Sequence, residues 1–330
     1  MSFIPSYLKF ADANELKNRA NNAEHLLSSC CCCPRNCEND RTSNKYGYCQ
    51  SGCLPIVSSY TAHFGEEPVL SGKHGAGNIF FGNCNLRCIF CQNSEISQNW
   101  NEERKHEVSV EKLAEIMIEL QGKNCHNIGL VSPTHFAPQI LKAISIAVSR
   151  GLYKPIIYNS NGYDSVKMLK LFDGVADIYL PDLKYGSNKY AKLYSDADEY
   201  FDYSKAAVKE MFRQIGAGLT YDGEVVIRGL IIRHLVLPND LAETEKVFEF
   251  IASELSPDVH ISLMSQYFPA HKVRKEILLQ RTVRYSEYEK VLSLLEKYDL
   301  KNGWIQEMDS FETYKPDFKN NRENPFLNPA

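Results

Sequence analysis

Apolar, β-branched runs alternate with amphipathic stretches from residue 78 onward. The apolar runs predict six strands, at 78–82, 127–132, 155–160, 177–182, 229–237 and 260–267. The amphipathic stretches predict helices near 109–122, 137–150, 163–172, 203–217, 241–254 and 285–298. Near-continuous apolar strands separated by helices are typical of a parallel sheet with helices outside it. We therefore expect an α/β fold, a partial (β/α)6 barrel of TIM type, with functional residues at the carboxyl ends of the strands.

The pattern changes at both ends of the chain. Residues 9–29 predict an amphipathic helix, and a cysteine-rich stretch with short polar connections follows at 30–53. The last thirty residues are polar and rich in Pro and Asn. We expect residues 1–75 to form an N-terminal helix with a Cys-rich metal-binding module, residues 76–300 the barrel, and residues 301–330 a C-terminal tail packed on the barrel at 304–308.

Composition and charge exclude several classes of protein. With 330 residues, of which 44% are hydrophobic and 24% charged, the chain has enough apolar material for a folded core. Its 37 Lys and Arg against 41 Asp and Glu give a net charge of −4 and no support for nucleic-acid or anionic-membrane binding. No apolar run reaches the ~18 residues of a membrane span, and the first residues lack the apolar core of a secretory signal. We expect a cytoplasmic protein.

Cysteines point to metal chemistry. There are eleven, and seven of them lie between residues 30 and 53. In a reducing cytosol such clusters are more often metal ligands than disulfides, and the odd count fits poorly with a fully paired framework.

One cysteine motif directly follows the first predicted barrel strand. Cys84, Cys88 and Cys91 are spaced C-x3-C-x2-C. Iron–sulfur clusters usually take four cysteines, so three thiolates at this spacing would leave one iron of a [4Fe–4S] cluster open to another ligand. A zinc site or three buried thiols is the alternative interpretation.

This motif resembles the fingerprint of the radical S-adenosylmethionine (SAM) superfamily, including Phe90 before the last cysteine. The segment 63–97 and the motifs SPTHFAP, YNSNGY, DIYLPDLKY, IIRHLVLP and SLMSQYFP resemble a subgroup related to pyruvate formate-lyase activating enzyme. The resemblance covers roughly residues 30–270. It implies a radical SAM type of partial barrel.

The resemblance also implies an activity. SAM would bind the open iron, and the reduced cluster would cleave it to a 5′-deoxyadenosyl radical that abstracts a hydrogen atom from the substrate. The subgroup implies an oxidoreductase that activates a glycyl-radical enzyme, with flavodoxin or ferredoxin as the reductant. A radical enzyme acting on a small molecule or a protein side chain is the first alternative, and a non-catalytic iron–sulfur protein the second.

Further site residues follow from the same motifs. Asp182 and Lys184 match the DLK motif of the activating enzymes, in which the lysine contacts the SAM carboxylate, and His234 matches a histidine near the adenosyl group. These three are the implied catalytic residues, although a surface ion pair and a core histidine are their structural alternatives. The implied cofactor-binding residues are Phe90, Ser132, Asn159, Ser160, Asp182, Lys184 and His234.

Two of these positions depart from the usual pattern. Asn159 stands where an Asp would help to form a monovalent-cation site. Ser132 begins SPTH where many relatives have a GGE-like turn that binds the SAM amino group. His135 in this turn could face the active site or pack. Gln266 and Tyr267 could line the substrate cavity or pack at the barrel rim, and Cys125 is expected to be a buried thiol.

The N-terminal cysteines form the second candidate metal site. The subgroup pattern C-x2-C-P-R-x-C followed by G-x-C selects four ligands: Cys30, Cys33, Cys37 and Cys49. Four thiolates suit either zinc or an iron–sulfur cluster. Cys31, Cys32 and Cys53 allow other ligand sets, and a metal-free loop is the remaining alternative.

Overall fold

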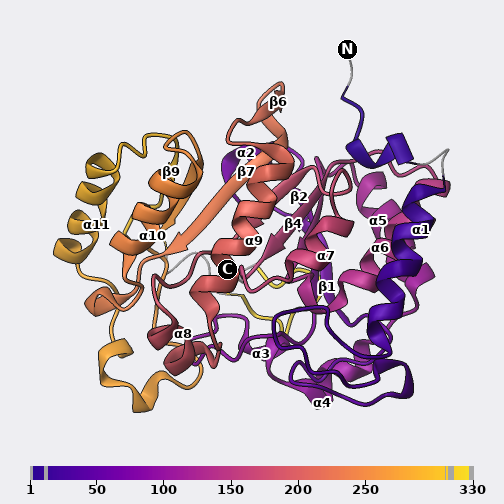
Figure 1. The fold of residues 1–330 in the computed structure, drawn as a ribbon, viewed down its shortest axis with the longest axis horizontal. Helices are drawn as coiled ribbons and strands as arrows, with labels where there is room; N and C mark the ends of the chain where they lie inside the picture. Colours follow the sequence, from indigo (N-terminus) through magenta and orange to yellow (C-terminus); the bar gives the residue numbers. More distant parts are fainter. Residues whose placement is uncertain (1–2, 11–13, 309, 311–315, 327–330) are drawn as a thin grey trace.

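A single mixed sheet organises the protein. The computed structural model describes residues 3–10, 14–308, 310 and 316–326, and within these it places nine strands in one sheet of order β1-β2-β3-β4-β5-β7-β8-β9, with β6 paired to β7. Figure 1 shows α1, α5 and α6 on one flank of the molecule and α10 and α11 on the opposite flank. The predicted α/β fold with a mostly parallel sheet is confirmed.

Six parallel strands coincide with the six predicted from the sequence. Each is hydrogen-bonded in parallel to the next, so their carboxyl ends meet at one edge of the sheet. Their bounds are β2 Ala76–Phe81, β3 Ile128–Val131, β4 Ile156–Ser160, β5 Ile178–Pro181, β7 Val225–Leu235 and β8 His260–Met264.

Strands outside the six predicted barrel strands lie at the edges. At one edge β1 (Val57–His63) pairs antiparallel with β2. At the other, β9 (Gly303–Ile305) pairs in parallel with β8, although its residues belong to the segment expected to be a tail. The short β6 (Thr220–Asp222) forms an antiparallel pair with the start of β7.

Most helices lie close to their predicted positions. The six expected within the barrel are α5 Val110–Gly122, α6 Ala137–Ser149, α7 Val166–Leu171, α9 Tyr200–Ile215, α10 Thr244–Phe250 and α11 Tyr285–Lys297. The predicted N-terminal helix is shorter than expected: α1 covers Glu15–Glu24, with 3-10 turns on either side at Ser6–Phe10 and His25–Leu27, and residues 11–13 lie outside the described part. Helices absent from the prediction are α2 Pro68–Ser71, α3 Ser94–Ser97, α4 Trp100–Glu103 and α8 Asn188–Ser195.

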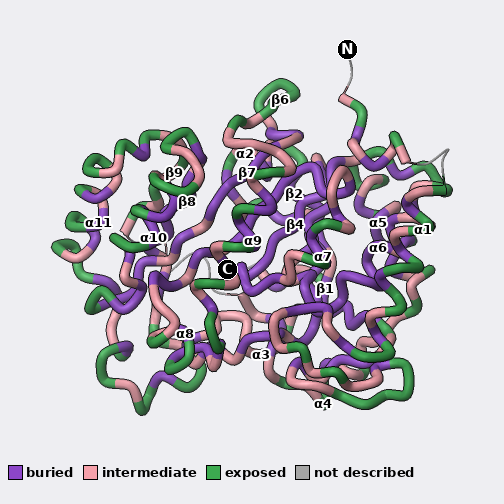
Figure 2. The backbone as a smooth tube through the Cα atoms, viewed as in Figure 1, coloured by how far each residue is buried: buried purple, intermediate pink, exposed green. Residues whose placement is uncertain are grey.

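The core lies between the sheet and its helices. The strands at the centre of the molecule are buried, whereas the outer faces of the peripheral helices are exposed (Figure 2). Every residue of β2 and β4 is buried, as a parallel strand covered on both faces requires. Among the described residues no helix combines the length and the apolarity needed to cross a membrane.

Strand β9 depends on a glycine. Gly303 has φ +127°, and a Cβ at this position would lie 1.9 Å from the carbonyl oxygen of Ile261 on β8. Replacement of Gly303 by alanine should therefore lower the free energy of unfolding by roughly 1–3 kcal/mol or more, through backbone strain and the clash. Urea unfolding of G303A against the wild-type protein measures the effect.

A second glycine provides the control. A Cβ at Gly122, at the end of α5, would meet no atom within 4 Å. G122A should therefore be neutral or stabilising by up to about 1 kcal/mol. Equal stability of G303A and the wild type would contradict the role assigned to Gly303.

Candidate active site

A cavity of about 510 Å³ lies at the carboxyl ends of the parallel strands. The cysteine loop that follows β2 lines one part of it, and residues after β3, β4, β5 and β8 line the rest. This is the edge at which parallel α/β folds place their binding sites. Its lining includes all three cysteines of the motif, Cys84, Cys88 and Cys91.

Each of the three cysteine sulfurs has a polar neighbour. Asn161 Nδ2 donates to the sulfur of Cys84 over 3.4 Å, and Ser195 Oγ donates to that of Cys88 over 3.0 Å. The sulfur of Cys91 lies 3.2 Å from Ser97 Oγ. Hydrogen bonds to sulfur stabilise a thiolate and tune an iron–sulfur cluster. These three neighbours were not predicted from the sequence, and Ser195 lies at the end of α8, a helix the pattern did not reveal.

The thiols are set in a low-dielectric environment. Burial raises the pKa of Cys84 to about 12 and that of Cys88 to about 11. Burial also raises the pKa of Cys91. Iron binding at these cysteines must therefore displace their protons.

Asp182 and Lys184 follow β5 and both line the cavity. The Nζ atom of Lys184 lies 2.6 Å from Oδ2 of Asp182. Burial acts to lower the pKa of Lys184, but the charges of Asp182 and Cys88 outweigh it and hold the pKa above its ordinary value. The cavity thus contains a permanent ammonium group beside the cysteine loop.

The remaining predicted cofactor-binding positions, apart from His234, also lie in this cavity: Phe90, Ser132, Asn159 and Ser160. Ser160 Oγ donates to Oδ2 of buried Asp164 over 2.5 Å, so its hydroxyl proton is already engaged. The backbone N–H of Ser132, which has φ 58°, donates to the carbonyl oxygen of Asn159 over 2.9 Å. This bond links the ends of β3 and β4 within the cavity wall.

Strand β7 turns Arg233 toward the cavity and His234 away from it. Arg233 lines the cavity, whereas His234 is fully buried among other side chains and is not part of the lining. The ring nitrogens of His234 lie 2.6 Å from the carbonyl oxygen of Leu183 and 2.9 Å from Oγ1 of Thr244. Both nitrogens are thus occupied by structural contacts. We therefore leave His234 out of the proposed site.

Arg233 belongs to an ion cluster that sequence reasoning missed. Its guanidinium forms hydrogen bonds to the carboxylates of Glu66 and Glu67, which precede α2 and also line the cavity. Asn78 Nδ2 donates to Glu66 over 2.6 Å. Burial acts to raise the pKa of Glu66, but the charge of Arg233 outweighs it and holds the pKa below its ordinary value. Two carboxylates against one guanidinium give this cluster a formal charge of −1.

The C-terminal segment 316–326 contributes to the cavity wall. Pro316 and Phe326 line the cavity, and the ring of Phe326 lies 4.1 Å from that of His63. Arg322 holds the segment in place through an ion pair with the fully buried Glu103 at 2.6 Å. Residues of the segment 316–326 therefore cover part of the cavity.

The other residues singled out in the sequence divide between cavity and core. Gln266 lines the cavity, whereas Tyr267 is buried against Phe90 and donates its hydroxyl to the carbonyl oxygen of Leu279. Cys125 is fully buried. His135 is buried at a separate pocket, which the N-terminal cysteines form.

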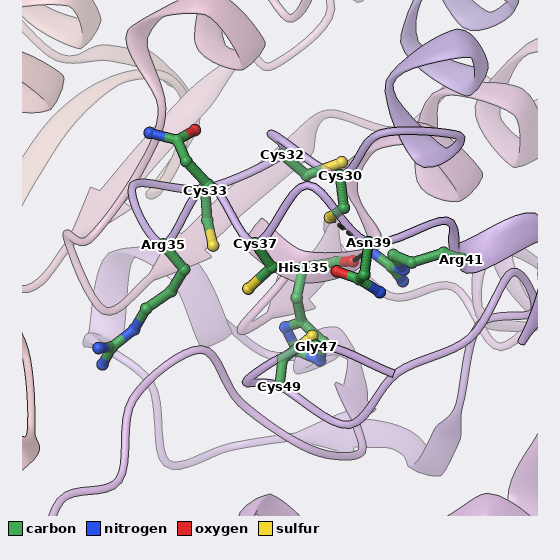
Figure 3. Close-up of a pocket in the computed structure, with 11 residues that line it drawn as sticks. Cys30, Cys32, Cys33, Arg35, Cys37, Asn39, Arg41, Gly47, Cys49 and His135 are labelled. Carbon is green, nitrogen blue, oxygen red and sulfur yellow. Dashed lines mark hydrogen bonds between the residues drawn. The ribbon is translucent and has the colours of Figure 1, made fainter. Parts of the chain in front are cut away.

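Figure 3 shows this second pocket. The four predicted ligands line it, together with Cys32, whereas Cys31 and Cys53 do not. Within the described residues, no three His, Cys, Asp or Glu side chains are arranged to hold a single metal ion. The predicted ligands are thus brought to one place, but the structure shows no metal coordination there.

Comparison with known proteins identifies the family. The model of the radical SAM superfamily matches residues 78–251, which is more than half of the chain. The chain belongs to the radical SAM superfamily. Membership implies a [4Fe–4S] cluster, SAM cleavage by a radical mechanism, oxidoreductase-type catalysis and a reductant such as flavodoxin or ferredoxin. The match does not distinguish the subgroup.

The chain is also similar to individual proteins. An uncharacterised protein of Methanocaldococcus jannaschii is 34% identical over 304 residues, which cover 89% of this chain and 82% of the relative. A structure of TYW1 with a lysine-pyruvate adduct bound is similar at 15% identity and a TM-score of 0.45, covering 70% of this chain and 77% of that one. Methylornithine synthase matches at 14% identity and a TM-score of 0.41, with 68% and 63% of the two chains covered.

Removal of Arg233 should destabilise the protein strongly. Arg233→Ala leaves two buried carboxylates unpaired, which costs about 3–5 kcal/mol in a typical protein. Because the carboxylates can be neutralised by protons, the deficit should shrink as the pH falls below the ordinary pKa of glutamate. Chemical unfolding at a series of pH values measures both effects.

Two further variants test whether the unpaired carboxylates cause the loss of stability in R233A. Arg150→Ala removes an arginine from an exposed pair with Glu115, and should change the stability by less than about 1 kcal/mol. Combining R233M with E66Q and E67Q removes all the charges together and should recover most of the lost stability. A deficit in R233A no larger than that in R150A would contradict the assigned role.

Proposed function

We propose that this protein is a radical SAM enzyme that acts on a small molecule bound in the same cavity as SAM. The supporting observation is that one cavity of about 510 Å³ contains the three motif cysteines, the Asp182–Lys184 pair and the Glu66–Glu67–Arg233 cluster. The same cavity thus offers thiolates for the cluster, an ammonium group for SAM and a charged cluster for a substrate.

The donor set fits a [4Fe–4S] cluster with an open iron. Cys84, Cys88 and Cys91 supply three thiolates, one fewer than such a cluster needs, and their sulfurs have the hydrogen-bond donors described above. When bound and reduced, the cluster supplies the electron that cleaves SAM to methionine and the 5′-deoxyadenosyl radical. The part of the protein is to position the pieces and to exclude water from the reaction.

The cavity residues near the cysteine loop provide the contacts for SAM. Lys184 is a half-buried cation that would form a charge-assisted hydrogen bond with the SAM carboxylate. Asp182 orients the ammonium group through the 2.6 Å contact. Ser132, Asn159 and Ser160 would supply polar groups from the ends of β3 and β4, and Phe90 an apolar wall.

The Glu66–Glu67–Arg233 cluster in the cavity lining is the proposed substrate site. Glu66 and Glu67 carry one more charge than Arg233 offsets, which favours a substrate with a positive charge or several hydrogen-bond donors. The volume lies within the range of small-molecule sites, roughly 300–1,000 Å³. Cover by the segment 316–326 also favours a small molecule over a protein loop, because a loop needs an open path into the cavity.

Activation of a glycyl-radical enzyme is the second candidate function. The Asp182–Lys184 pair in its DLK motif supports it, because the pair faces the cavity, as the resemblance to the activating enzymes implies. In that case the segment 316–326 must move aside to admit a loop of the partner. In the two functions the 5′-deoxyadenosyl radical abstracts hydrogen from different groups, a small molecule in the first and a glycine of the partner enzyme in the second.

Lys184 should be needed for SAM binding but not for cluster assembly. Lys184→Ala removes a charge-assisted hydrogen bond, so SAM affinity should fall roughly 10- to 100-fold. The measurement is SAM binding to anaerobically reconstituted protein, with the cluster followed by electron paramagnetic resonance. Lys167→Ala, an exposed lysine on α7, is the matched control. Unchanged affinity in K184A would contradict the proposed role.

Product analysis separates the two candidate functions. Reduced protein with SAM should release 5′-deoxyadenosine, measured by mass spectrometry, and a C88A variant should release none. Small cationic metabolites should increase this release if the substrate is a small molecule. A glycyl-radical doublet on an added glycyl-radical enzyme would instead establish the activase. Absence of 5′-deoxyadenosine under all conditions would contradict both.

A further inference from the structure

We infer that the N-terminal cysteine pocket binds a second metal centre with four protein ligands, three of them pocket cysteines and the fourth His135 of the barrel. The ligands of this centre would then come from both the N-terminal module and the barrel. The inference does not depend on the function proposed above, because it concerns a different set of side chains.

The loops that carry the cysteines approach one another closely. Cys30, Cys33, Cys37 and Cys49 surround the pocket, and Figure 3 shows the sulfurs of Cys33 and Cys37 directed into the same space. Gly47 makes the approach possible, because a Cβ at this position would lie 2.9 Å from the sulfur of Cys37. The backbone at Gly47 thus packs closely against the side chains of Cys37 and Asn39.

A buried cation beside the pocket needs negative charge. Arg41 is 1% exposed and also lines the pocket. Its guanidinium donates to the carbonyl oxygens of Gly52 and His135 and lies 3.9 Å from the sulfur of Cys30. The described part of the chain offers it no carboxylate partner. Burial of an unpaired charge is costly, and a centre with several thiolates would supply the missing counter-charge.

His135 presents an unused lone pair to the cysteines. Its Nε2 lies 2.9 Å from the carbonyl oxygen of Gly82, which can only accept, so Nε2 carries the proton. Its Nδ1 is then unprotonated, and this atom is buried without a hydrogen-bond partner. Metal-ligating histidines usually donate their other ring N–H to a carbonyl or carboxylate in this way. The Nδ1 atom of His135 is therefore available as a metal ligand.

The pocket is connected to the loop that carries the radical-cluster cysteines. Gly82, which accepts the His135 hydrogen bond, lies two residues before Cys84. Arg35 Nε donates to the carbonyl oxygen of Asn85 over 3.0 Å, and Arg87 donates to that of Tyr48 over 3.1 Å. A metal in the pocket would stabilise the module and thereby brace this loop on both sides of Cys84.

Thiolate and imidazole donors select zinc or iron, the latter as an iron–sulfur cluster. The test uses full-length protein with C84A, C88A and C91A, which removes the ligands proposed for the radical cluster. Elemental and sulfide analysis after anaerobic purification should find zinc, or iron with sulfide, bound stoichiometrically. Either metal supports the site, and metal-free folded protein would overturn it. Failure of the function proposed above would not affect this result.

Variants in the same background identify the ligands. C33A and C37A should abolish metal retention, whereas C31A and C53A should retain it, because those two cysteines do not line the pocket. H135Q should lower metal affinity at least tenfold in competition with a chelator. Full retention in C37A would overturn the site, and unchanged affinity in H135Q would overturn the role of His135.

A measurement without pocket substitutions guards against misfolding of these variants. Alkylation of the folded parent protein, followed by peptide mass spectrometry, should label Cys31 and Cys53 while Cys33 and Cys37 stay protected. Removal of the metal by a chelator should expose Cys37 to labelling, because its side chain is only partly buried in the structure. Equal labelling before and after the chelator would contradict metal binding in the pocket.

Discussion

Parallel hydrogen bonding between six successive strands is the constraint on which the site depends. Because β2, β3, β4, β5, β7 and β8 run in one direction, their carboxyl ends meet at one edge, and residues distant in the sequence line one cavity there. The cysteines that follow β2 and Lys184, which follows β5, therefore line the same cavity. Substitutions in the loops that follow the strands can change the site while the hydrogen bonds between the strands stay in place.

The sequence predicted this framework because its signal is local. The apolar runs of the strands differ from the amphipathic pattern of the helices between them. The three motif cysteines lie within eight residues, so the motif can be recognised in the sequence. Strand β9 was missed because it has only three residues, and its pairing with β8 depends on a glycine in a backbone conformation that the sequence does not display. Helix α8 was missed although Ser195 at its end contacts Cys88.

The direction in which a side chain points was harder to predict from the sequence than the strand or loop on which it lies. Adjacent residues on β7 face opposite sides, and only the three-dimensional register shows that Arg233 faces the cavity and His234 the helices. The Glu66–Glu67 pair lies more than 160 residues from Arg233, so no local pattern links them. The same holds for His135, which packs against cysteines about 100 residues earlier in the chain. Long-range electrostatic pairing is the information that a single sequence lacks.

The wall formed by residues 316–326 has a consequence for how the protein matures. The cysteine loop is synthesised more than 200 residues before this segment, which ends up against β2, bound through Arg322 to Glu103. Chains fold from the N-terminal end as they emerge from the ribosome. Before residues 316–326 are synthesised and docked, the cavity lacks the part of its wall that they form, so the loop is then more accessible to iron and sulfide. The order of synthesis thus favours insertion of the cluster before this part of the wall is in place.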